Sequence, residues 1–320
     1  MIALLSKEIW IQRRAQQKGY EMESLLGPAA RVLLIGFLVT VMMSVGLEVT
    51  ARESVATLRN QRHVIGALLA NFVVVPLLGL GIARIVPMPT NIETGFLLLA
   101  AAPGALFAIN FTHKLRGSVP FAAAMLFLLT VLSLLFTPPL ARLLLNIDRA
   151  LTLPYGRAIS ALLLYIVLPM AFGLAINRWA HPLALKLQKP VSICAGLLFA
   201  LEIVFTGALK STAMKKVGIN GLCAMLVLII ASMICGWLLG GPDDGTRRVL
   251  TVSTSLRNVA LCLAIAARSF PGADVDVAVI AFSSLMFPPN AVFTMYHVRK
   301  MKKQAAQSVH AAARNPTVGV

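Results

Sequence analysis

The chain has 320 residues, of which 58% are hydrophobic and only 13% are charged, whereas soluble domains are roughly 45–50% apolar and about 25% charged. A soluble globule of this composition could not cover its core with polar side chains. The net charge of +17 does not indicate a nucleic-acid partner, because the basic residues lie mostly between apolar runs and predict loops beside anionic lipid headgroups. The chain is therefore predicted to be an all-α integral membrane protein in contact with the lipid bilayer.

Residues 1–30 are predicted to form an N-terminal arm and not a full membrane span. They include Lys7, Arg13, Arg14 and Lys18, which are costly in hydrocarbon. This charged lead is also too long for a secretory signal peptide. Whether the arm contains a partial first helix stays open.

Nine apolar runs follow, each long enough to span about 30 Å of hydrocarbon. They are residues 31–50, 63–86, 93–112, 118–145, 155–177, 190–209, 217–240, 249–269 and 275–298. Three of the runs contain helix breakers near a centre or an end. These breakers are Pro103-Gly104 in the third run, Pro120 and Pro138-Pro139 in the fourth, and Pro288-Pro289-Asn290 in the ninth.

The distribution of Lys and Arg predicts the orientation in the membrane. The segment 301–320, read as a basic tail, follows Arg299 and Lys300 and should be cytoplasmic. Nine spans then place the N-terminus outside, and the cytoplasmic loops and tail carry about twice as many basic residues as the outer loops. The basic N-terminal arm opposes this orientation, so a ten-element arrangement with a half-inserted first segment stays open. The predicted location is the plasma membrane, in bacteria the inner membrane.

Two of the runs are interrupted by polar or helix-breaking residues near mid-membrane. The centre of 93–112 reads APGALFAIN, and the centre of 249–269 reads STSLRN. Irregular or polar backbone is tolerated there only where protein buries it or where it lines a cavity. Two unrelated kinks are one explanation, and the binding site of a secondary transporter is the other.

The positions of the two interrupted runs favour the transporter. They take corresponding places in a first unit, residues 31–146, and a second unit, residues 190–298, which are separated by a linker helix over 155–177. A single helix between them makes the two units run in opposite senses. Interrupted helices at corresponding places of inverted repeats are typical of secondary transporters, with the binding site where they meet.

Several segments together resemble the bile acid:sodium symporter family. They are MMSVGLEV, NFVVVP, APG, LLFTPPL and RNVAL, in this order over residues 31–300. The resemblance implies one transporter domain over these residues. It also implies inverted repeats with two crossing discontinuous helices, divided into a panel domain and a core domain. Some members lack the first helix, which leaves nine.

The resemblance also identifies the positions where sodium-coupled members carry ligands. Here these positions hold Ala108, Ile109, Ala122, Leu126, Ser253 and Arg257. A sodium ion needs several oxygen ligands, which alkyl side chains do not supply, and a guanidinium repels it. Sodium is possible from the family name but disfavoured by these residues, and no other cofactor or metal is expected.

Arg257 is the only basic residue placed deep inside a run. Because a charge at mid-membrane costs at least about 2.5–3.5 kcal/mol, it should have a function. It could replace the sodium charge and hold a carboxylate or sulfonate as a bidentate clamp. It could instead form a structural ion pair with Glu202, the only acid deep inside a run. Protonation of Glu202 could also couple transport to a proton gradient.

Other polar residues are weaker candidates for contact with a solute. Asn71 and Asn258 could line the crossing or form interhelical hydrogen bonds. Ser253, Ser255 and Thr112 could bind a solute or their own helix carbonyls, and Asn110 lies beside Thr112.

The predicted function is transport of a small organic anion by alternating access. The alternatives are a sodium- or proton-coupled symporter of a bile-acid-like or carboxylate solute, and a non-transporting receptor or channel on the same fold. An enzyme is not expected, since the chain has no Walker, HExxH, GxSxG or CxxC motif. The sequence does not identify the substrate, the direction of transport or the oligomeric state.

Overall fold

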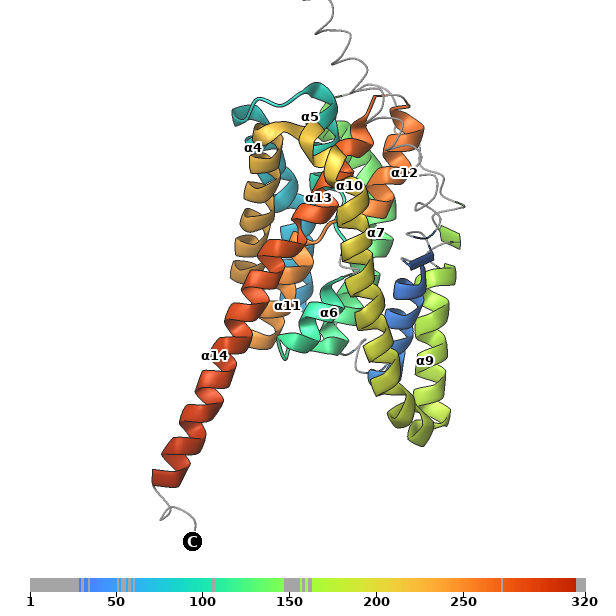
Figure 1. The fold of residues 1–320 in the computed structure, drawn as a ribbon, viewed down its shortest axis with the longest axis vertical. Coiled ribbons are helices and arrows are strands. Elements are labelled where there is room, and N and C mark those ends of the chain that lie inside the picture. Colours follow the sequence, from blue (N-terminus) through green and yellow to red (C-terminus); the bar gives the residue numbers. More distant parts are fainter. Residues whose placement is uncertain are drawn as a thin grey trace, which may run out of the picture.

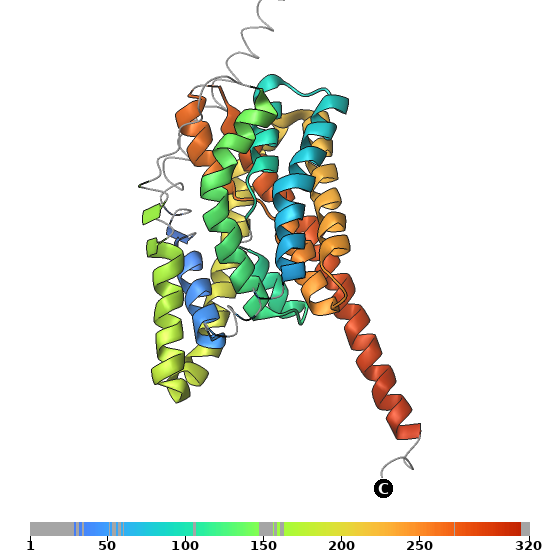
Figure 2. The ribbon, with the colours of Figure 1, turned by 180° about the vertical axis from the view of Figure 1, so that it is seen from behind.

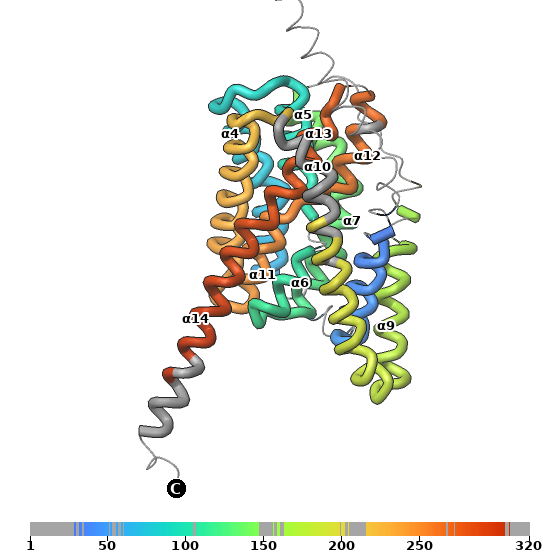
Figure 3. Tube along the Cα trace, viewed as in Figure 1, coloured from blue at the N-terminus to red at the C-terminus, as the bar shows by residue number. Residues whose placement is uncertain are grey.

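A computed structural model gives the fold, and all regular elements in the part of the chain that it describes are helices (Figure 1; coloured in Figure 3). That part comprises residues 35–50, 61–104, 107–146, 163–271 and 273–314, with isolated positions between 29 and 60 and between 147 and 162. Its helices form an elongated bundle. Four are long and apolar enough to cross a membrane: Gln61–Ile85, Val119–Leu145, Lys216–Leu239 and Val275–Gln304.

The first spans combine α-helix with short π-helical turns. The helix Ile35–Glu48 comes first. Then α3 (Gln61–Leu69), η1 (Ala70–Val74) and α4 (Val75–Ile85) form one continuous helix. The π-turn η1 precedes Pro76, which has no N–H to maintain the α-helical ladder.

The next span is broken, and the one after it is not. α5 (Thr90–Ala101) and α6 (Ala108–Lys114) are separate helices along one path through the bundle. By contrast, α7 (Val119–Leu145) is continuous, although Pro138 and Pro139 lie inside it. The kink predicted near an end of this run therefore does not divide the helix.

The middle of the chain repeats the π-turn and then forms two helices that share the label α10. The π-turn η2 (Leu163–Val167) leads into α9 (Leu168–Trp179), again with a proline in the first turn of the α-helix. α10 (His181–Leu239) covers both 190–209 and 217–240. Its backbone leaves the helical conformation at Gly218, where φ is 73°, so α10 consists of two helices that meet at this glycine, one for each predicted run.

The last two spans are both interrupted. α11 (Asp244–Ser255) and α12 (Val259–Ser269) are separated by three residues. α13 (Val275–Leu285) and α14 (Phe287–Arg314) are separated only by Met286. The segment 301–320, read from the sequence as a tail, is therefore helical as far as Arg314, consistent with the high helix propensity of Lys, Gln and Ala.

The turns lie at two opposite ends of the bundle (Figure 1 and, from behind, Figure 2). At the lower end in Figure 1, a side chain at Gly241 would meet the His63 ring. At the upper end, Asn220 donates a hydrogen bond to the Pro87 carbonyl over 3.2 Å. The end of α6, the end of α9 and the start of α11 lie toward the lower end (Figure 1), and these helices carry Lys114, Arg178 and Arg247 there. Which end faces the cytoplasm stays a prediction.

The core is apolar, and so is much of the outer surface. Phe96, Phe121 and Phe282 are fully or almost fully buried. Leu77, Phe172 and many other large apolar side chains are exposed on the flanks, as expected of a protein surrounded by lipid. Cys194 and Cys223 also belong to the exposed surface, whereas Cys235 and Cys262 are buried.

One helix pair packs at unusually short range. A methyl group at Gly46, on helix Ile35–Glu48, would lie 2.2 Å from the Met170 carbonyl oxygen of α9. A methyl group at Gly173 would lie 2.5 Å from the Met43 carbonyl oxygen. The backbones of these two helices therefore touch. The pair lies with the first part of α10 at one flank in Figure 1, but the division into repeats, panel and core stays a prediction.

Candidate functional site

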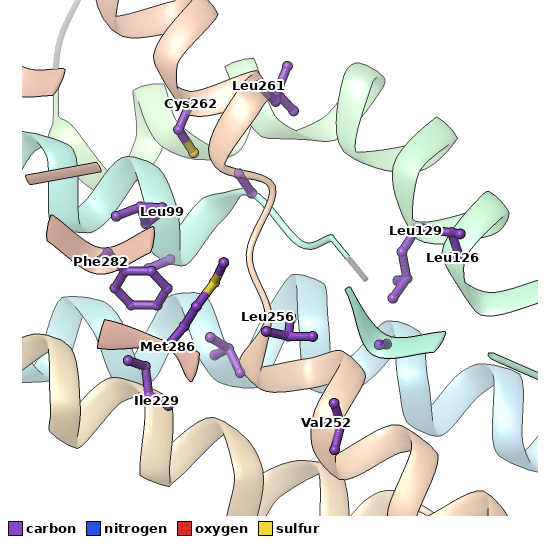
Figure 4. Packing of buried hydrophobic residues seen from close by; sticks show 14 of the residues in the cluster. Leu99, Leu126, Leu129, Ile229, Val252, Leu256, Leu261, Cys262, Phe282 and Met286 are labelled. Carbon is purple, nitrogen blue, oxygen red and sulfur yellow. The ribbon is translucent and has the colours of Figure 1, made fainter. Parts of the chain in front are cut away.

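The two broken helices meet at their breaks, inside the bundle. Pro103 and Arg257 face each other in an isolated antiparallel bridge. The Asn258 backbone N–H donates to the Ala102 carbonyl over 3.0 Å. In Figure 4, the extended stretch between Leu261 and Leu256 passes across the extended stretch that leaves the helix of Leu99. The expected crossing of two discontinuous helices is therefore present, and it joins 93–112 to 249–269.

The first break follows from its own residues. Pro103 has no N–H to continue the ladder of α5, and it disfavours the α conformation at Ala102, whose φ and ψ are −111° and 85°. Gly104 then allows close approach of the second break, because a side chain there would lie 2.8 Å from both the backbone N and Cβ of Asn258.

The second break contains neither proline nor glycine, and side chains stabilise its ends. Leu256 is extended, with φ −85° and ψ 125°. The Asn258 side chain caps α12 by accepting from the Leu261 N–H over 3.2 Å, and it donates to Ser133 Oγ of α7 over 3.1 Å. Such an N-cap satisfies a backbone donor that the start of a helix leaves free.

The Arg257 side chain is buried, with only 3% exposed. Nε donates to the Leu99 carbonyl over 2.9 Å, and a terminal nitrogen donates to the Ala100 carbonyl over 2.5 Å. The other terminal nitrogen donates to Asn71 Oδ1 over 3.2 Å and to the Thr254 carbonyl over 3.4 Å. The guanidinium is thus bound by oxygen atoms of the protein.

Asn71 is held in place by the same cluster. Its Nδ2 donates to the Ala67 carbonyl over 2.9 Å and to Thr254 Oγ1 over 3.4 Å, which leaves Oδ1 to accept from Arg257. The structure therefore brings together Asn71, Arg257 and Asn258 at the crossing.

The other predicted residues have more local partners. Ser253 Oγ donates to the Val249 carbonyl, and Thr112 Oγ1 donates to the Ala108 carbonyl over 2.8 Å, in each case within the same helix. Ser255 Oγ donates to the Val252 carbonyl and to Asn290 Oδ1, both over 2.9 Å. Asn110 has a buried Nδ2 without a hydrogen-bond partner in the described part of the chain.

Three residues that sequence reasoning missed also contact this region. Thr137 Oγ1 donates to the Ala101 carbonyl at the end of α5 over 3.2 Å. Ser133 accepts from Asn258, and Asn290 accepts from Ser255. Ser133, Thr137 and Asn290 are fully buried. The only signal in the sequence was that each is a polar residue inside an apolar run. Asn290 also directly follows a pair of prolines.

The positions implied for sodium ligands are closely packed hydrocarbon. Ala108 is fully buried, and Ile109, Ala122 and Leu126 are each 1% exposed. The Leu126 side chain lies in the packed cluster shown in Figure 4. These four side chains have no oxygen ligand, and the Ser253 hydroxyl hydrogen is used within its own helix.

The proposed ion pair with Glu202 lies outside the description, because the Glu202 side chain is not among those described. Among the side chains that are, no carboxylate lies within 4.0 Å of Arg257; the two ion pairs found are His113–Glu48 and Lys216–Asp274. The described residues also contain no cluster of His, Cys, Asp or Glu that could hold a metal.

A helical membrane protein in which two interrupted helices cross has the architecture of a secondary transporter. A family model described as "Sodium Bile acid symporter family" matches residues 35–239, and the chain belongs to this family. Its members are transporters, so the chain is a membrane transporter and not an enzyme.

Individual relatives have low sequence identity to this chain, but the alignments cover most of it. The chain is 23% identical over 270 residues to "Uncharacterized sodium-dependent transporter YocS" of Bacillus subtilis, covering 82% of this chain and 78% of that protein. It is 24% identical to the rice "Probable sodium/metabolite cotransporter BASS2, chloroplastic", covering 76% of this chain and 58% of that protein. It is also 24% identical to the corresponding BASS6 of Arabidopsis thaliana, covering 74% and 60%. The chain thus spans about three fifths of the two plant proteins.

Proposed function

We propose that the chain is a secondary transporter of a small organic anion, working by alternating access around the crossing. The supporting observation is the buried Arg257 guanidinium, which every described neighbour meets with a neutral oxygen. The guanidinium therefore carries a formal positive charge that no described carboxylate pairs with, in surroundings of low dielectric where electrostatic attraction is strong. A negative solute beside Asn258 would be stabilised by this charge.

Sodium does not drive transport in this proposal, although the names of the relatives YocS and BASS2 describe them as sodium-dependent or as sodium cotransporters. The hydrocarbon at Ala108, Ile109, Ala122 and Leu126 offers no ligand, and Arg257 already supplies a positive charge. The driving force is then the gradient of the solute itself, or of a proton if Glu202 takes part.

The proposed location is the plasma membrane, with the lower end of Figure 1 in the cytoplasm. The basic residues at that end support this orientation.

Binding can be tested on purified protein, because a ligand that binds the native state raises the melting temperature. A panel of carboxylates and sulfonates is screened in sodium chloride and in choline chloride. Uptake of each hit is then measured in proteoliposomes in the same two salts. We expect equal stabilisation and equal uptake in both salts. Uptake that requires sodium would refute the proposal that sodium does not drive transport.

Two further measurements separate the alternatives. Accumulation without measurable conductance in planar bilayers supports a carrier, whereas steady conductance indicates a channel. Binding without accumulation of any solute of the panel indicates a receptor. Glu202→Gln, with uptake measured across pH, tests proton coupling, which is excluded if uptake and its pH dependence do not change.

A further inference from the structure

The C-terminal end of α5 lies in the core, where its last carbonyl groups have no helical N–H to accept from. Three of these carbonyls find donors in other elements. Leu98 O accepts from Cys262 Sγ over 3.6 Å, Ala101 O from Thr137 over 3.2 Å, and Ala102 O from the Asn258 N–H over 3.0 Å. The Leu99 carbonyl accepts from the Ala102 N–H over 3.1 Å and also from Arg257, whereas the Ala100 carbonyl accepts from Arg257.

The four oxygens around the Arg257 guanidinium come from three separate segments. They are the carbonyl oxygens of Leu99, Ala100 and Thr254 and the side-chain oxygen of Asn71. Neutral carbonyl oxygens in such an arrangement are what proteins use to replace the hydration shell of a monovalent cation. We call these four atoms the oxygen cage.

Helix dipoles add to the attraction of the cage for a cation. α5 ends at Ala101 and α11 ends at Ser255, so two C-terminal helix ends lie beside the guanidinium. Each such end carries about half a negative charge, and cations are stabilised there. The oxygen cage therefore favours a positive charge. Without one, the Ala100 and Thr254 carbonyls and Asn71 Oδ1 would lose the bonds described for them, and Leu99 O would keep only the bond from the Ala102 N–H.

We infer that the oxygen cage is a cation-binding site that the chain fills with its own guanidinium. The crossing is then independent of inorganic cations in the natural protein. Removal of the Arg257 side chain opens a site for an external monovalent cation, best a small alkylguanidinium, and less well sodium or potassium accompanied by water. The inference concerns the stability of the crossing and holds whether or not an organic anion is the transported solute.

The test compares purified wild type, Arg257→Ala and Arg268→Ala. Arg268 is the matched control, because it is an exposed arginine near the end of α12. Melting temperatures are measured in choline chloride and after replacement of a few millimolar choline by methylguanidinium, sodium or potassium at constant ionic strength. Wild type and control should show no cation dependence. Arg257→Ala should melt lower in choline and recover by several degrees, in a saturable manner, with methylguanidinium.

A different result overturns the inference. Equal melting of Arg257→Ala in all four salts would show that the oxygen cage binds no external cation. If this variant does not fold, Arg257→Lys and Arg257→Gln decide the question, because lysine keeps a charge that glutamine lacks. We expect the lysine variant to be the more stable of the two in choline, and the reverse order contradicts the inference.

A second change sharpens the test. In the Arg257→Ala background, Asn71→Asp adds a carboxylate to the oxygen cage. This double variant should bind sodium or potassium at least tenfold more tightly than Arg257→Ala, as read from the concentration at half-maximal stabilisation. A double variant with no gain in cation affinity would contradict the placement of Asn71 in the cage.

Discussion

The two helix breaks at the crossing are made by opposite means. The first depends on Pro103 and Gly104, and its hydrogen bonds to other elements are accepted mainly by its backbone carbonyls. The second contains Leu256, Arg257 and Asn258 and supplies the donors. One break is therefore dictated by backbone chemistry and the other by side chains. Loss of a side chain should therefore destabilise the protein more at the second break than at the first. Addition of a side chain should destabilise it more at the first break.

The largest expected effect comes from removing the charge of the second break. Arg257→Met should lower the free energy of unfolding by about 2–4 kcal/mol, because buried acceptors without a partner cost about 1–3 kcal/mol each while the cost of burying the charge is relieved. Unfolding can be followed by dye labelling of the buried Cys262 thiol in a variant whose other cysteines are serine. Arg268→Met is the control and should change stability little; equal losses in both variants would contradict the comparison.

The next effect comes from adding a side chain to the first break. Gly104→Ala places a methyl group 2.8 Å from Asn258 Cβ, and overpacking of this kind costs about 1–3 kcal/mol. Gly81→Ala on α4 is matched, because nothing lies within 4 Å of its new methyl group. It should leave stability unchanged or raise it. A tolerated Gly104→Ala would mean that the two breaks are not in close contact.

Removal of the Asn258 side chain tests the cap that ends the second break. Asn258→Ala loses the hydrogen bonds to Leu261 N–H and Ser133. We expect a loss of about 1–2 kcal/mol, since an N-cap contributes about 1 kcal/mol. Ser118→Ala, which removes the cap of α7 near the end of the bundle, should cost less, because water can replace that bond. The opposite order would argue against the role given to Asn258.

The two interrupted spans also differ at the N-termini of α5 and α11, which lie away from the crossing. Only α11 has a side-chain cap there. α5 begins without a side-chain cap, whereas Asp243 caps α11 by accepting from the Thr246 N–H over 2.7 Å. This bond lowers the pKa of the Asp243 carboxyl below its ordinary value of 3.8. Asp243→Ala should cost about 1 kcal/mol at neutral pH. The pKa of Asp243 is lower in the folded than in the unfolded state, so the stability that its carboxylate adds is lost as pH falls below 3.8. The difference in free energy of unfolding between Asp243→Ala and wild type should therefore shrink there, and a difference that does not change with pH would contradict the role of the Asp243 carboxylate as a cap.

The smallest effect is expected for a bond that supports the first break from α7. Thr137→Val removes the donor to the Ala101 carbonyl with little change of shape. Interhelical hydrogen bonds in membranes contribute about 0.6 kcal/mol on average, so the melting temperature should fall only slightly. A loss as large as that of Arg257→Met would show that α7 holds the crossing, and not the guanidinium.

The contrast between the breaks also explains which features the sequence could predict. Pro103-Gly104 and the STSLRN segment stand out in apolar runs, so the interruptions and their meeting were predictable. The partners of Arg257 were not, because three of its four acceptors are backbone carbonyls, which every residue has. Thr137 and Ser133 stood out only as polar residues in an apolar run, which does not identify a partner, since an isolated hydroxyl in a membrane helix commonly binds its own backbone. The turn at Gly218 reflects a local glycine conformation that periodicity does not reveal.

The final helix, α14, starts close to the crossing and ends far from it. α14 starts at Phe287, one residue after the end of α13, and is 28 residues long, and its last part extends beyond the lower end of the bundle (Figure 1). At a rise of 1.5 Å per residue it is about 40 Å long, so a tilt of about 5° at Met286 moves its tip by about 3–4 Å. A spectroscopic label near the tip would therefore magnify small rearrangements near the crossing, to which Asn290 connects this helix through Ser255.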